Sequence, residues 1–242
     1  MQSAFAVASF RLVVLLLAVT FTLANGNAFA AKSKKAPKPP AAKPAPEESE
    51  ATPVAAPSLP PAGSSPLAEL KKSNAALKKL FAKSTPSWSP EQDVKRSEMR
   101  KIVNGFLDFE ELAHRALARH WGGLAAEQRS EFVRVLRDLI ERNYIKQVHG
   151  QPNYDLRFHK EEVAGSEATV TASLHTSKKN KKITIEMEYK LLYKGDRWLV
   201  YDVITDEQSM LENYRAEFNK IITKESFDAL LKRMKKRLEK TE

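Results

Sequence analysis

The hydrophobic period changes twice along this chain, and this switch constrains the fold more than any other feature. Apolar residues recur at helical spacing from Leu67 to Val148, alternate with polar residues from Asp155 to Thr205, and return to helical spacing up to Leu238. A single block of strands between helices favours one antiparallel sheet over a parallel one. The pattern therefore predicts an α+β fold in which a helical layer packs on a four-stranded antiparallel sheet.

Local signals set the bounds of these elements. Ser65, Ser89 and Ser209 each precede an expected helix and are suited to cap it. Three turns separate the four alternating runs, as expected for hairpins: residues 163–166 and 194–196, which contain glycine, and residues 178–181. We expect helices over residues 66–81, 91–104, 109–117, 126–148, 210–222 and 227–238. We expect strands over residues 155–160, 167–176, 182–193 and 197–205.

The first 66 residues are predicted to lie outside the folded domain. Arg11, the apolar run 12–23 and Ala28-Phe29-Ala30 have the order of a secretory signal peptide, which predicts cleavage after Ala30 and a periplasmic location. The alternative is a membrane anchor, but an apolar run of about a dozen residues is short for a bilayer that needs roughly 20. Residues 31–66 hold most of the thirteen prolines and read as a disordered Pro/Ala/Lys-rich tether, followed by the domain at 67–242.

Several chemistries are excluded or unsupported by the sequence. The chain has no cysteine, which removes disulfides, thiolate metal sites and thiol nucleophiles. Its histidines show no ligand spacing with one another, and no catalytic or phosphate-binding motif is present. We therefore expect no enzyme activity, no metal and no cofactor. The net charge of +10 would suit nucleic acid, an anionic membrane surface or an acidic partner, but export argues against nucleic acid and leaves transient membrane contact open.

Several short strings occur in a fixed order, beginning with residues 106–117, Trp121 and the Gln128, Arg129, Phe132 spacing. They continue with residues 139–144, residues 198–203 and Ser209 followed by Asn213-Tyr214-Arg215. Over residues 70–239 their order and spacing resemble the toluene-tolerance or MlaC family. The sequence departs from the family pattern at Glu207, where a glycine is usual.

The resemblance implies a curved sheet of the nuclear-transport-factor type, with a lipid cavity between sheet and helices. It also implies a periplasmic carrier that maintains outer-membrane lipid asymmetry. Its ligand would be a phospholipid. Its implied partners are an inner-membrane ABC transporter with an MCE-domain ring and an outer-membrane lipoprotein complex.

The dry face of the third strand is the main candidate for a pocket wall. Periodicity alone favours an ordinary core packed by helix side chains, whereas the resemblance favours a wall that solvates acyl chains. The candidate wall residues are Ile183, Ile185, Met187, Tyr189, Leu191, Phe132, Leu136, Tyr144, Leu174 and Tyr201.

Basic residues supply candidates for a lipid headgroup or an acidic partner. They are Lys178, Lys179, Lys181 and Lys182 in one hairpin, and Arg215. Arg215 could instead pair with Asp202 or Glu217. The predicted function is phospholipid binding and transfer between the inner-membrane transporter and the outer membrane. The alternatives are a carrier of a hopanoid-type lipid and an envelope adaptor whose core is filled.

Overall fold

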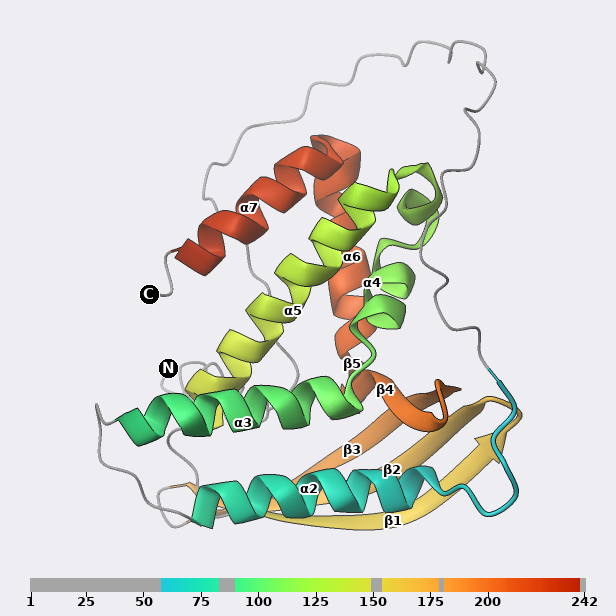
Figure 1. Cartoon of the computed structure of the whole chain (residues 1–242), viewed down its shortest axis with the longest axis vertical. Coiled ribbons are helices and arrows are strands. Elements are labelled where there is room, and N and C mark those ends of the chain that lie inside the picture. Colours follow the sequence, from blue (N-terminus) through green and yellow to red (C-terminus); the bar gives the residue numbers. More distant parts are fainter. Residues whose placement is uncertain (1–57, 83–89, 149–153, 179–180, 240–242) are drawn as a thin grey trace, which may run out of the picture.

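A computed structural model describes residues 58–82, 90–148, 154–178 and 181–239 (Figure 1). In the described residues, four α-helices and a short 3-10 helix precede a sheet, and two α-helices follow it. In chain order, the elements are α2 (Pro66–Ala82), α3 (Pro90–Phe106), α4 (Phe109–Leu117), the 3-10 helix η1 (Ala118–Gly123), α5 (Ala126–Val148), β1 (Tyr154–Ala164), β2 (Glu167–Lys178), β3 (Lys181–Lys194), β4 (Arg197–Thr205), β5 (Gln208–Ser209), α6 (Met210–Lys224) and α7 (Phe227–Glu239).

The sheet is an antiparallel meander in the order β1-β2-β3-β4-β5. Two of the turns between its strands contain residues with positive φ angles, which suit the twist of paired strands. Gly165 has φ +62° between β1 and β2, and Gly195 and Asp196 have φ +58° and +66° between β3 and β4. A register shift between Phe158 and Lys160 places a bulge in the edge strand β1. A second shift follows Lys190 in β3.

These features confirm the predicted α+β class and the four predicted strands. Residues 126–148 and 197–205 have the bounds that the pattern indicates, and the structure adds the two-residue strand β5. Two of the predicted caps are present, since Ser65 Oγ accepts from Ala68 N at 3.1 Å and Ser209 Oγ accepts from Glu212 N at 2.9 Å. The third, Ser89, lies outside the described residues. The structure adds a cap at the start of α4, where Asp108 Oδ1 accepts from Glu111 N at 3.0 Å.

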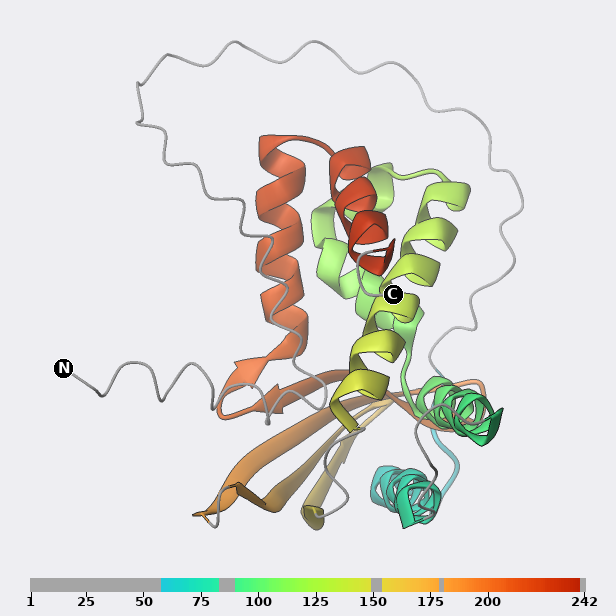
Figure 2. The same ribbon diagram turned by 90° about the vertical axis from the view of Figure 1, so that its left-hand side faces the viewer.

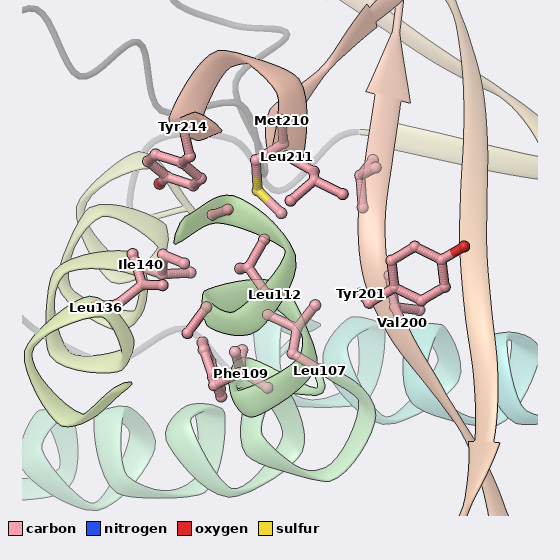
Figure 3. Close-up of a cluster of buried hydrophobic side chains, with 14 of the residues drawn as sticks. Leu107, Phe109, Leu112, Leu136, Ile140, Val200, Tyr201, Met210, Leu211 and Tyr214 are labelled. Carbon is pink, nitrogen blue, oxygen red and sulfur yellow. The ribbon is translucent and has the colours of Figure 1, made fainter. Parts of the chain in front are cut away.

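The helices divide into two groups around the sheet. Figure 2 shows α2 and α3 beside the sheet, while α4, α5, α6 and α7 stand together as a bundle at its far end. The bundle has a dense apolar centre in which Phe132, Phe218, Leu230 and Met234 are at most 1% exposed. Part of this packing, with Leu112, Leu136 and Ile140 side by side, is visible in Figure 3.

Structure begins before the predicted domain start. Ser58 N donates to Tyr193 O at 3.3 Å, and Trp198 Nε1 donates to Ser64 Oγ at 2.9 Å, so the stretch ahead of α2 contacts the sheet. The predicted signal peptide and residues 31–57 of the predicted tether lie outside the described residues. No helix in the described part of the chain is long and apolar enough to cross a membrane.

Candidate functional site

An apolar pocket lies between α2 and the inner face of the sheet. Its lining comes from two helices and three strands. These residues are Leu70, Ser73, Asn74 and Leu77 of α2, Phe106 of α3, Tyr154, Leu156 and Phe158 of β1, Leu174 of β2, and Met187 and Tyr189 of β3. The space between the walls is about 550 Å³ including its opening to solvent, and about 60 Å³ of it is interior volume.

Strand register explains why these sheet residues share one wall. Leu156 pairs with Leu174, and Phe158 pairs with Ala172, which in turn pairs with Met187. Directly paired residues point to the same face of a sheet, so each row presents apolar groups to the pocket.

The two phenol groups in the wall are neutral and paired. Tyr154 Oη donates to Asn74 Oδ1 at 3.3 Å, and burial raises the pKa of Tyr154 to about 12. Tyr189 is buried, its hydroxyl donates to Met187 Sδ at 3.8 Å, and burial raises its pKa further above the usual value. Both phenols therefore stay uncharged at neutral pH.

No carboxylate, ammonium or imidazole is among the described residues that line this pocket. Proton transfer would need such a group within reach of a reactant. The described residues also contain no cluster of three or more side chains that could hold a metal ion. What the pocket can do chemically is shelter hydrocarbon from water.

Helix α2 is held to β1 by contacts along its length. Glu161 Oε2 accepts from both Ser65 Oγ at 2.8 Å and Leu67 N at 2.9 Å, which fixes the start of the helix. Lys78 lies 3.8 Å from Asp155 near the other end. That second pair is about half exposed and contributes little, so the buried leucines and Glu161 hold the helix in place.

The structure brings three of the predicted wall residues into the pocket. Leu174, Met187 and Tyr189 are part of its lining. Ile183, Ile185 and Leu191 are buried in the same strand but are not part of that lining.

The other predicted wall residues lie elsewhere. Phe132 and Leu136 belong to the helical bundle, where the Phe132 ring lies 5.4 Å from Phe218 and 5.9 Å from Phe227. Tyr201 packs under the Arg115 guanidinium at 4.0 Å. The side chain of Tyr144 lies outside the described residues.

Of the predicted headgroup residues, the structure describes the side chains of Lys182 and Arg215. Lys182 is exposed on β3, while Lys179 and the side chains of Lys178 and Lys181 lie outside the described part. Arg215 pairs with Glu212 at 2.6 Å and donates from Nε to Arg115 O at 3.1 Å, which ties α6 to α4.

Asp202, proposed above as a partner of Arg215, serves the start of α6 instead. Its carboxylate accepts from Ser209 Oγ at 2.6 Å and from Leu211 N at 2.9 Å. The contacts of Arg215 and Asp202 are therefore structural ones between elements of the helical bundle and β4.

Sequence reasoning missed the α2 and β1 contributions to the wall. β1 carried a usable signal, because Tyr154, Leu156 and Phe158 alternate with charged or imidazole side chains just as β3 does. For α2, the spacing of Leu70 and Leu77 predicts a buried side, but nothing in the sequence says which surface that side covers.

Comparison with known proteins agrees with the fold. The family model described as MlaC protein matches residues 72–236. The intermembrane phospholipid transport system binding protein MlaC of Haemophilus influenzae is 23% identical over 141 residues, which cover 57% of this chain and 66% of that protein. A phospholipid-binding protein from Ralstonia solanacearum, solved in complex with a phospholipid, superposes with a TM-score of 0.59 at 16% identity, over 72% of this chain and 97% of the solved one.

Proposed function

This chain belongs to the MlaC family, and on that premise we propose that it is an exported carrier that binds a phospholipid with its acyl chains beneath α2. The observation that carries the proposal is the apolar, uncharged lining of that pocket. The names of the Haemophilus and Ralstonia proteins, which speak of phospholipid transport and phospholipid binding, support the choice of ligand.

The energetics favour hydrocarbon in such a pocket. Each methylene removed from water contributes about 0.8 kcal/mol, so even half of an acyl chain outweighs a few lost contacts. The interior volume of about 60 Å³ is on the order of a few water molecules. A whole chain therefore requires α2 to move away from the sheet, and Leu174, Met187 and Tyr189 would then contact the tail.

Lipid extraction followed by mass spectrometry tests the proposal. Protein purified from its own periplasm should carry phospholipid. Ser73→Phe should lose most of it, because Ser73 lines the pocket and is only partly buried, so a phenyl ring can enter the space without rebuilding the core. Ala76→Phe is the matched control, since Ala76 lies exposed on the same helix and should leave lipid binding unchanged.

The same spectrum decides between the remaining alternatives. A polycyclic lipid in place of phospholipid would support the hopanoid-type carrier. Protein without any extractable lipid, in both the parent chain and the Ala76→Phe variant, would contradict a carrier and support the adaptor with a filled core.

The transfer step is a finer part of the proposal. We place the protein in the periplasm after cleavage at Ala30, between an inner-membrane ABC transporter with MCE domains and an outer-membrane lipoprotein complex, where it would maintain lipid asymmetry. The lysines at positions 178, 179, 181 and 182 remain candidates for headgroup or partner contacts. N-terminal sequencing of the exported protein, and lipid exchange with the isolated transporter, test these points.

A further inference from the structure

The outer side of α2 is basic. Leu70, Leu77 and Leu80 are buried beneath the helix, while its four lysines are exposed. An α-helix turns about 100° per residue, so these lysines centre on the side opposite the leucines. We call this surface the α2 lysine face; it consists of Lys71, Lys72, Lys78 and Lys79.

Among the side chains that the structure describes, two acidic groups lie near these lysines on α2 and β1. Glu69 is half-buried at the start of the helix, and Asp155 is about half exposed at 3.8 Å from Lys78. Water screens such an exposed pair, so the pair leaves most of the field of the four lysines in place. The adjacent helix α3 presents the exposed Arg100 and Lys101 together with the exposed Glu98.

The α2 lysine face lies on the same helix that forms one wall of the pocket. Figures 1 and 2 show α2 at the periphery of the molecule, away from the helical bundle. The same helix supplies Leu70, Ser73, Asn74 and Leu77 to the apolar pocket. A surface that attracts the α2 lysine face therefore comes to lie beside the pocket wall.

We propose that the α2 lysine face docks the protein on an anionic phospholipid bilayer, with α2 between the headgroups and the pocket. Lysine carries a compact charge on a flexible stem, which suits a fluid layer of phosphates better than a fixed bidentate partner. The choice of a membrane as partner deepens the proposed lipid-carrier function and rests on it. The docking itself is measured without any lipid transfer.

Vesicle co-sedimentation of the exported, purified chain tests the docking. Vesicles of phosphatidylcholine with added phosphatidylglycerol should bind the protein at low salt. Vesicles of phosphatidylcholine alone should not bind it. Binding should disappear at about 1 M salt, where the Debye length is roughly 3 Å. Replacing the lysine face with glutamine should weaken the partition coefficient about fivefold for each lysine. The variant carries Lys71→Gln, Lys72→Gln, Lys78→Gln and Lys79→Gln.

A matched variant controls for net charge. It removes four exposed lysines from α6 and α7, namely Lys220, Lys224, Lys232 and Lys236, in the same way. It should retain most of the binding. Equal losses in the two variants, or no binding of the parent chain to anionic vesicles at low salt, would overturn the proposal. The second result would favour an acidic protein as the partner of α2. Circular dichroism of both variants establishes that they are folded, and extractable lipid reports separately on the carrier function.

Discussion

Glu207 has a backbone conformation that suits glycine. It follows Asp206 in the turn between β4 and β5, where the two residues have φ +65° and +47°. Such a pair of positive φ angles is typical of a two-residue turn that prefers glycine at its second position. Glu207→Gly should therefore raise the free energy of unfolding by roughly 0.5–1 kcal/mol, after the entropy of the added glycine is counted.

Urea denaturation measures this change. Glu207→Ala is the control, because it removes the carboxylate and keeps a Cβ atom in the same conformation, so it should leave stability near that of the parent chain. If alanine stabilises as much as glycine, the gain comes from the lost charge and the conformational explanation is wrong.

Glu141 is a buried carboxylate whose charge opposes folding. It is 8% exposed on α5, and its burial raises the pKa of the carboxyl even though Arg100 Nε lies 3.5 Å away. Because the folded-state pKa exceeds that of the unfolded chain, stability falls as the pH rises through these values. We expect Glu141→Gln to be more stable than the parent chain at about pH 7 and equal to it below about pH 4. Thermal unfolding across this range, with the exposed Glu127→Gln as control, checks the sign.

At the scale of elements, Glu161 decides how firmly the start of α2 is held. Its carboxylate accepts two hydrogen bonds from the first residues of the helix. Glu161→Ala should lower stability by about 1–3 kcal/mol, because hydrogen bonds to charged groups exceed neutral ones in strength. Hydrogen exchange should accelerate in α2 and stay unchanged in β2 and β3.

The neighbouring glutamate offers a control for that experiment. Glu162 is exposed and pairs with Lys160 on the outside of the sheet. Glu162→Ala should leave exchange in α2 as it was. Unchanged exchange in α2 of the Glu161→Ala chain would show that the buried leucines alone hold the helix.

The elements themselves were predictable, but their partners were not. Caps such as Ser65 and Ser209, and the alternation from Ile183 to Leu191 in β3, are local signals that the tertiary structure preserves. Phe132 and Leu136 show the limit, since a helical stripe indicates burial and says nothing about which surface buries it. A bulge defeats the alternation rule at Tyr201, because the register shift between Lys190 and Leu191 interrupts the correspondence between β3 and β4.

At the scale of the whole molecule, the helical bundle and the pocket are separate, and we expect the bundle to set stability and the pocket to set lipid binding. Phe132 is fully buried among bundle side chains, so Phe132→Ala should cost about 3–5 kcal/mol of stability. The described residues that line the pocket all come from α2, α3 and the sheet, and none comes from the bundle. The amount of lipid bound per folded molecule should therefore not change. Denaturant unfolding and lipid extraction on the same preparation measure the two effects.

Ser73→Phe should give the reverse pattern, with lipid lost and the unfolding midpoint nearly kept. A Phe132→Ala chain that is folded and yet free of lipid would mean that the bundle and the pocket are coupled.

The bulge in β1 bears on how the protein stays apart from other copies of itself. β1 is an outer strand of the sheet, and unpaired backbone groups on such a strand can recruit a second copy of the chain. The shift at His159, with charged side chains at Arg157, Lys160 and Glu162, makes this edge irregular and well hydrated. Self-association by strand addition along this open side is thereby discouraged.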